Sequence, residues 1–185
     1  MTKSILKTSA MAAAMLLFTG AAQAVSQDVA VNGGFETGDF TGWTQFPQTG
    51  TQTVLSPGNG SNFYANLSAT SDGSAGVDNV IKNANLAAGL LTPGAPITVT
   101  FDMRGTLTGA GGVVFVELFS ELSGGGVSKQ EFIVQPPTFP TANWVPFVFN
   151  STLGPDVSGG VTLQLKAACG AVAGCGVSAD FDNIT

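Results

Sequence analysis

The side chains that could carry chemistry in this sequence are mainly carboxylates, because the chain contains no histidine. Without histidine, neither a Ser-His-Asp nor a Cys-His arrangement can form, so nucleophilic catalysis of those kinds is excluded. Two carboxylate pairs have spacings that a glycosidase could use: Asp180 with Asp182, and Glu117 with Glu121. Neither pair lies in a recognisable active-site motif, and strand faces carry such pairs routinely. We therefore expect no catalytic residues and no enzymatic activity of this domain alone.

Residues 31–43, VNGGFETGDFTGW, combine glycines with large apolar side chains and two carboxylates. The Gly33–Gly34 pair permits a close approach of backbone that side chains would block. Phe35 and Trp43 carry enough apolar area to anchor the segment to a core. Glu36 has no basic residue near it in sequence, so it is either solvated or faces a cation. A plain turn with a surface acid is the alternative interpretation.

Residues 1–24 have the three parts of a secretory signal peptide. A basic region with two lysines spans residues 3–7, a short apolar core spans residues 10–18, and residues 22–24, AQA, fit the cleavage rule. The apolar core is too short to cross a bilayer, and no later run reaches the ~20 residues that a spanning helix needs. We therefore expect a protein secreted or displayed at the cell surface, with residues 25–185 as its single mature domain.

Composition excludes partners that need clustered positive charge. Of 6 basic residues, two lie in the signal peptide, so the mature chain carries 4 basic against 12 acidic residues, a net charge of 4 − 12 = −8. Nucleic acid and anionic lipid both need clustered lysine and arginine, so we expect neither as a partner. Calcium is the natural counter-ion for the remaining carboxylates, because it is hard and prefers oxygen ligands.

Cys169 and Cys175 are the only cysteines. In an exported chain we expect them to form a disulfide that closes the loop between them. Zinc binding by the pair is disfavoured because zinc needs further ligands and the chain has no histidine. A redox role is disfavoured because the spacing differs from the two-residue gap of redox dithiols.

The mature chain predicts an all-β fold. Its length suits one domain with a sizeable core, and its Gly, Thr, Ser and Val content favours short strands joined by tight turns. The cleanest strand is Ile97 to Met103, ITVTFDM, where apolar and polar residues alternate. Residues 144–150 form another strand, which Pro146 confines to an edge or a bulge. About nine or ten such strands predict an antiparallel sandwich.

The two ends of the mature chain resemble one family. NGGFE at residues 32–36 with TGW at residues 41–43, and ADFDNI at residues 179–184, resemble the opening and closing strands of certain carbohydrate-binding modules. These are the modules with a galactose-binding-like jelly roll, such as families 4, 9 and 22, and the opening also resembles exported bacterial surface proteins. The likeness extends over residues 31–185, by pattern alone between the ends. It implies a jelly roll that binds glycans without catalysis.

The resemblance also implies a structural calcium. In the family, the glutamate of the opening motif and the aspartate of the closing strand meet at the ion, with backbone carbonyls completing its shell. By motif, these ligands correspond here to Glu36 and Asp182, with the carbonyls near Gly34. First and last strands pair as neighbours, so the two acids would repel each other unless a cation lay between them. The alternative is that both acids are merely solvated.

Glycan binding needs exposed aromatic platforms that stack on the apolar face of a sugar, beside planar polar groups that read its hydroxyls. The candidate platforms are Phe46, Tyr64, Phe139 and Trp144, and the candidate polar partners are Asn62, Asn66, Gln130 and Gln135. One tyrosine and two tryptophans are a thin supply of platforms. Exposed aromatics on a concave sheet face would favour a polysaccharide or surface glycan as partner. A smooth Thr/Ser face would favour the alternative, a structural or adhesive surface protein.

Relatives in the family continue for a few strand residues past the position that matches Thr185. We therefore expect either a fragment of a longer protein or a sorting tail, with attachment to a surface beyond Thr185. An accessory module of a polysaccharide-degrading enzyme is the third interpretation, and it requires a catalytic domain outside this sequence.

Overall fold

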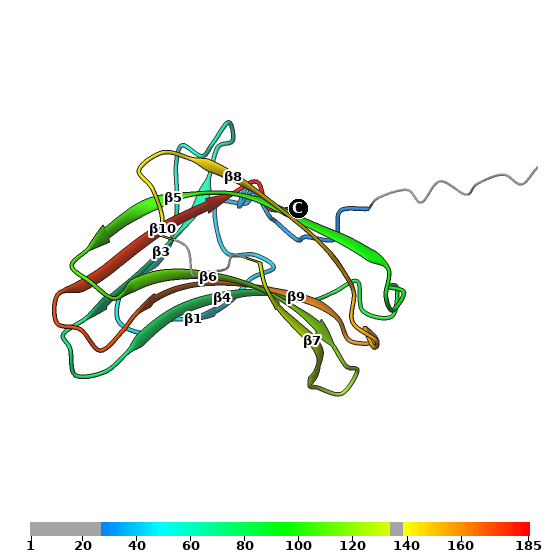
Figure 1. The fold of residues 1–185 in the computed structure, drawn as a ribbon. Helices are drawn as coiled ribbons and strands as arrows, with labels where there is room; N and C mark the ends of the chain where they lie inside the picture. Colours follow the sequence, from blue (N-terminus) through cyan, green and yellow to red (C-terminus); the bar gives the residue numbers. More distant parts are fainter. Residues whose placement is uncertain (1–26, 134–138) are drawn as a thin grey trace, which may run out of the picture.

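The computed structural model describes residues 27–133 and 139–185, which form two packed antiparallel sheets (Figure 1). Sheet A has the order β1 (Thr44–Phe46), β4 (Val77–Leu86), β9 (Gly160–Cys169), β6 (Gly112–Glu121) and β7 (Val127–Phe132). Sheet B has the order β2 (Gln52–Leu55), β3 (Tyr64–Ser71), β10 (Cys175–Asp182), β5 (Pro96–Thr108) and β8 (Val145–Thr152). The predicted all-β antiparallel sandwich is thus confirmed. The predicted signal peptide, residues 1–24, lies outside the described residues.

Alternation along each strand builds the core between the sheets, because successive side chains of a strand point to opposite faces. On β5, Val99, Phe101 and Met103 are buried, as the ITVTFDM pattern predicts. The ring of Phe101 stacks on Phe147 of β8, with centroids 4.9 Å apart. Pro146 lies on β8, an edge strand of sheet B, as its missing N–H predicts.

The opening segment, predicted to be the first strand, is a series of turns instead. Residues 31–43 contain no strand, and β1 begins only at Thr44. Asn32 and Phe35 adopt positive φ values of 52° and 54°, outside the region of regular strand backbone, and Phe35 N donates to Asn32 O at 3.1 Å to close a turn. The prediction that Phe35 and Trp43 anchor the segment is confirmed, because both are buried with ring centroids 5.3 Å apart.

A buried asparagine holds this opening segment against sheet A. Asn83 on β4 accepts a hydrogen bond from Val31 N at 3.0 Å and donates to the carbonyls of Val31 and Gly42 at 2.9 Å each. The segment is thereby carried across the sandwich to the closing strand, where Ile184 N donates to Gly33 O at 3.1 Å. Figure 1 shows the first described residues lying close to the C-terminus.

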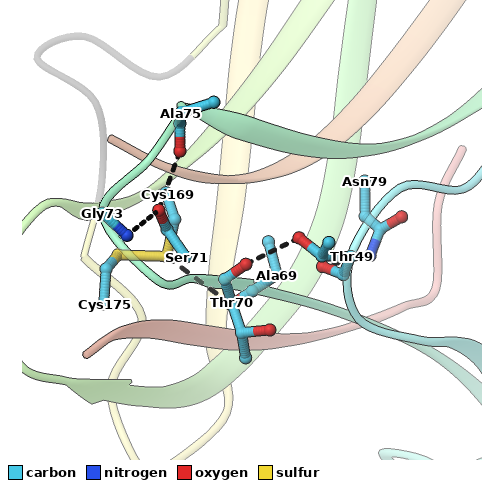
Figure 2. The surroundings of a disulfide bond; sticks show 9 residues. All are labelled: Thr49, Ala69, Thr70, Ser71, Gly73, Ala75, Asn79, Cys169 and Cys175. Carbon is cyan, nitrogen blue, oxygen red and sulfur yellow. Dashed lines mark hydrogen bonds between the residues drawn. A yellow bond between two sulfur atoms is a disulfide. The ribbon is translucent and has the colours of Figure 1, made fainter. Parts of the chain in front are cut away.

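Cys169 and Cys175 form the predicted disulfide (Figure 2). Cys169 ends β9 of sheet A and Cys175 begins β10 of sheet B, so the bond joins the two sheets where the chain passes between them. Beside it, the Ser71 hydroxyl donates to Ala75 O at 2.8 Å and accepts from Gly73 N at 3.1 Å. The chain is therefore fixed on both sides of this corner.

Within the described residues, no helix is long and apolar enough to span a membrane.

Replacing both cysteines by alanine is expected to lower the free energy of unfolding by roughly 2 kcal/mol, because the open loop regains freedom in the unfolded chain. Urea titration followed by tryptophan fluorescence measures this change. Reduction of the wild-type protein should lower the midpoint by the same amount, with no further effect on the double variant. An unchanged midpoint in both experiments would show that the bond adds nothing to stability.

Candidate functional site

The outer face of sheet A collects aromatic, amide and charged side chains from all five of its strands. These positions alternate with core residues such as Ile81, Val116 and Leu165, so they point away from sheet B. We call this surface the sheet A face. It consists of Phe46 on β1, Lys82 on β4, Gln164 and Lys166 on β9, Phe115, Glu117 and Phe119 on β6, and Gln130 and Phe132 on β7.

A carboxylate lies at the centre of the sheet A face. Glu117 is only 4% exposed and pairs across the sheet with Gln164 on one side and Phe132 on the other. Its two oxygens accept hydrogen bonds from the side-chain amides of Gln130, at 2.9 Å, and of Gln164. Because each amide donates its NH2 group inward, its carbonyl oxygen remains available as an acceptor. Glu117 thus fixes the orientation of both amides.

Aromatic rings surround this polar centre. Phe115 and Phe132 lie with centroids 6.3 Å apart, and Phe46 is 47% exposed at the β1 edge. Figure 1 shows sheet A bent, with its outer face on the concave side. A concave face with exposed rings beside fixed amides is the arrangement by which proteins hold a sugar ring and read its hydroxyls.

Two lysines rest on the same rings. Lys82 Nζ lies 5.6 Å from the ring centroids of both Phe46 and Phe119. Lys166 Nζ lies 4.4 Å from the centroid of Phe115 and 3.7 Å from a carboxylate oxygen of Asp78. These are cation–π contacts, which hold a flexible lysine in place at a surface.

A pocket of about 550 Å³ continues the sheet A face at one end. Strands contribute Lys82, Ala84 and Asn85 of β4, Glu121 of β6 and Thr162 of β9. Three connecting segments contribute Ala88, Leu122, Ser123, Gly124, Gly125, Ser158 and Gly159.

The outer face of sheet B holds a second aromatic group that is organised around an arginine. The Arg104 guanidinium carbon lies 4.5 Å from the Trp144 ring centroid and 5.2 Å from that of Tyr64. Arg104 Nε donates to Asp180 Oδ2 at 2.8 Å, and this hydrogen bond raises the pKa of Arg104. Asn66 Nδ2 donates to the other oxygen of Asp180 at 2.6 Å. These two rings therefore already pack on a protein cation.

The structure does not bring the four predicted platforms together. Phe46 lies on the sheet A face, whereas Tyr64, which is 8% exposed, and Trp144 contact Arg104 on the opposite sheet. Phe139 is 61% exposed in the connection before β8. The predicted polar partners are divided likewise: Gln130 lies on the sheet A face, Asn66 joins Asp180, Asn62 binds Glu36, and Gln135 lies outside the described residues.

The three predicted calcium ligands do come together, at a place we call the closure site: Gly34, Glu36 and Asp182. A Cβ placed on Gly34 would lie 3.6 Å from Glu36 Cγ and 3.8 Å from Asp182 Oδ1, so both acids flank this glycine. Asp182 is 0% exposed. Neither acid forms an ion pair with lysine or arginine among the described residues.

Both acids of the closure site also hold the connection between β2 and β3. Asp182 Oδ2 accepts from Asn59 N at 2.7 Å and from Ser61 Oγ at 2.5 Å, while Asp182 Oδ1 accepts only from Asn183 N, at 2.7 Å. Glu36 Oε1 accepts from the backbone N–H groups of Asn62 and Phe63 at 3.0 Å each. Glu36 Oε2 accepts from Asn62 Nδ2 at 2.7 Å.

The donor set at the closure site suits a hard cation. A carboxylate oxygen accepts two hydrogen bonds, so one acceptor position remains on Glu36 Oε2 and one on Asp182 Oδ1, the oxygen that faces Gly34. The described residues contain no group of three or more His, Cys, Asp or Glu side chains that could hold a metal. Backbone carbonyls or water would therefore have to complete a calcium shell at this site.

Hydrogen bonding keeps Glu36 ionised. The Asn62 side chain and then the Phe63 N–H lower the pKa of Glu36, because both donate to its charged form. A lowered folded-state pKa stabilises the fold at pH values above the unfolded pKa. That contribution is lost as the pH falls through the folded pKa.

Comparison with known proteins bears on the fold. No protein-family model matches the sequence, and no curated protein matches it. Among solved structures, a family 16 carbohydrate-binding module has a TM-score of 0.56 at 16% identity, with 85% of this chain and 98% of that chain covered. TmCBM61 in complex with beta-1,4-galactotriose has a TM-score of 0.52 at 16% identity, with 86% of this chain and 97% of that chain covered. The CBM22-1 xylan-binding domain of Paenibacillus barcinonensis Xyn10C has a TM-score of 0.52 at 11% identity, with 82% of this chain and 88% of that chain covered.

The chain has the fold of a jelly-roll carbohydrate-binding module. The resemblance predicted from the two end motifs is confirmed at the level of the fold.

Sequence reasoning missed most of the sheet A face of this carbohydrate-binding-module fold. Phe115, Phe119 and Phe132 were not among the predicted platforms, and Glu117 was considered only as a carboxylate pair with Glu121. The signal was present in residues 113–122, VVFVELFSEL, which are apolar on both faces. The outward-facing positions of that strand are Phe115, Glu117 and Phe119. A strand face exposed only to solvent would not require two phenylalanines there.

The adjacent glycines of the opening motif provide a matched test of the closure geometry. Gly33→Ala would place a Cβ 1.9 Å from Ile184 O, so backbone has to move, and we expect a loss of about 3 kcal/mol in unfolding free energy. Gly34→Ala makes only ordinary contacts and is expected to change stability by less than about 1 kcal/mol. Urea unfolding of both variants measures the difference. Equal losses would contradict the close approach of Gly33 to the closing strand.

Proposed function

We propose that this protein is a non-catalytic glycan-binding module that holds a polysaccharide on the sheet A face. The observation that carries the proposal is the buried Glu117, which fixes the amides of Gln130 and Gln164 among phenylalanine rings on an outward face. Burying a carboxylate and the Gln164 amide on the outside of a sandwich adds nothing to the core, so it favours a ligand as the reason. The neighbours with this fold support the proposal, since one was solved with beta-1,4-galactotriose and another is a xylan-binding domain.

The extent of the sheet A face supports a polymeric ligand. Its side chains run from Phe46 on β1 to Phe132 on β7, across five strands, a width of about 19 Å at ordinary strand spacing. Both of these strands are edges of sheet A. A chain that lies across the strands can therefore continue past either edge, which suits an internal stretch of polysaccharide.

The engagement of the carboxylates supports a role without catalysis. Glu117 is held by two amides, Asp180 by Arg104 and Asn66, and Asp182 by the connection at Asn59 and Ser61. A general acid or a nucleophile of a glycosidase must instead face the scissile bond with its partner. Export through the signal peptide remains part of the proposal, and the disulfide supports it, because such bonds persist in oxidising compartments.

A structural or adhesive role is the second candidate, and the outer face of sheet B favours it. Thr98 on this face donates to Asn150 at 2.8 Å, and the Thr100 hydroxyl lies 2.6 Å from that of Thr185. Such a hydroxyl-rich surface suits contact with another surface better than a sugar ring. The attachment of a sorting tail beyond Thr185 belongs to this second candidate.

Truncating a ring of the sheet A face is expected to weaken glycan binding about tenfold, because one stacked ring contributes roughly 1 kcal/mol or more. Phe46→Ala and Phe119→Ala are compared with wild type by isothermal titration calorimetry against xylohexaose and beta-1,4-galactotriose. Val148→Ala, which removes an exposed apolar side chain from sheet B, is the matched control and should bind as wild type does.

Two results of that experiment would redirect the proposal. If a fourth variant, Trp144→Ala, loses binding while Phe119→Ala keeps it, the glycan site would instead lie at the Arg104 group on sheet B. Absence of binding to every glycan tested by the wild-type protein would favour the structural or adhesive role.

We also propose that the closure site binds one structural calcium, through Glu36 Oε2 and Asp182 Oδ1. Oxygen ligands, the absence of a protein cation for either acid within the described residues, and the small Gly34 between them support this assignment. When bound, the ion would link the opening segment to β10, in addition to the hydrogen bond between Gly33 and Ile184.

Calcium at ~100 times its dissociation constant is expected to raise the unfolding midpoint by roughly 5 to 10 °C relative to EGTA. Glu36→Gln keeps the shape of the side chain but removes the charge, so it should abolish the difference between calcium and EGTA. Asp72→Asn, in a connection remote from the closure site, is the control and should keep it. Equal midpoints of the wild-type protein in calcium and in EGTA would exclude a structural calcium.

A further inference from the structure

One cation of the sheet A face lacks an acidic partner. The basic residues within the described part of the chain are Lys82, Arg104, Lys129 and Lys166. Arg104 pairs with Asp180, Lys129 with Glu131 and Lys166 with Asp78, whereas Lys82 forms no ion pair with a described residue.

Lys82 is also held by aromatic rings at the edge of the pocket, where a bound ligand would contact it. It is half-buried, its ammonium lies between the rings of Phe46 and Phe119, and it lines the 550 Å³ pocket. The rings remove water from the sides of the ammonium without neutralising it. Its hydrogen-bond donors are therefore best satisfied by an anion that enters over the sheet A face.

The nearby acids do not neutralise Lys82. The backbone of Glu117 lies two strands from that of Lys82, about 10 Å by strand spacing, and the Glu117 carboxylate is already held by two amides. Glu121, the carboxylate of the pocket, lies two strands away and about four residues further along, at roughly 16 Å. Neither acid forms an ion pair with Lys82.

A second lysine strengthens the positive potential around Lys82. Because Lys82 pairs with Gln164 and Val80 pairs with Lys166, the two lysines are diagonal neighbours on β4 and β9. The Asp78 partner of Lys166 is 3.7 Å away and 46% exposed, which makes that ion pair weak. Lys82 and Lys166 thus share the outer face of sheet A with the carboxylates of Asp78, Glu117 and Glu121, and Lys82 is the cation there without an ion pair among the described residues.

We propose that the ligand of the sheet A face is an acidic polysaccharide, whose uronate carboxylate binds Lys82 while its sugar rings stack on the phenylalanines. This inference rests on the proposed function and specifies its ligand class. Gln130 and Gln164 form hydrogen bonds with the sugar hydroxyls, and Lys82 pairs with the uronate carboxylate. Lys166 supports the potential from the neighbouring strand.

The test compares trigalacturonate with its methyl ester, which has the same sugars but no charge, by isothermal titration calorimetry. Wild type is expected to bind the acid about tenfold more tightly than the ester, because a charge-assisted hydrogen bond is gained, and added salt should reduce this ratio. Lys82→Met should abolish the preference, and Lys82→Arg should restore most of it. Lys129→Met, which removes a cation from the Glu131 pair, is the charge-matched control and should keep the ratio.

The outcomes separate this inference from the function on which it rests. Equal affinity for acid and ester, or a ratio that Lys82→Met leaves unchanged, would overturn the acidic ligand. Neutral glycans that bind through Phe46 and Phe119 would then still support the glycan-binding role. Absence of binding to acid, ester, xylohexaose and beta-1,4-galactotriose alike would overturn both proposals.

Discussion

The alternation of side chains along every strand is the constraint on which this molecule depends. Each sheet gives one set of side chains to the shared core, so every other position of a strand must lie on one of two outer faces. On β6, Val114, Val116 and Leu118 fill the core, and Phe115, Glu117 and Phe119 are thereby directed outward. A one-residue change of register would exchange the two sets, which is why the core and the sheet A face specify each other.

The ends of the chain show how much the sequence determines and where it fails. The strands with clear alternation, such as Ile97 to Met103, were predicted correctly, because burial of one face decides their conformation. The opening motif was predicted to be a strand and is a series of turns, since its glycines serve a close approach of backbone rather than a ladder. The approach of Glu36 to Asp182 was expected only from the resembling family, in which first and last strands are neighbours.

The candidate site was harder to predict than the fold, for a physical reason. An aromatic residue gains by burial anywhere, so its type alone does not say whether it faces the core, a protein cation or solvent. Trp144 and Tyr64 were reasonable platforms by type, but they pack on Arg104. Phe119 resembles a core residue in sequence, and only the register of β6 against β9 directs it outward. Alternation in the sequence shows which residues share a face of the strand, and the packing of the two sheets decides which of the two faces is the outer one.

Both outer faces contain aromatic–cation contacts, but the two contacts differ in role. On sheet B, the rings of Tyr64 and Trp144 enclose a guanidinium whose charge Asp180 already balances, so the group is complete and joins the segment before β8 to β5 and β10. On sheet A, the rings of Phe46 and Phe119 flank an ammonium that no described carboxylate balances. Because a half-buried cation gains most from a direct anionic partner, the first arrangement favours stability and the second favours a ligand. The difference between the faces therefore lies in whether the chain supplies the anion itself.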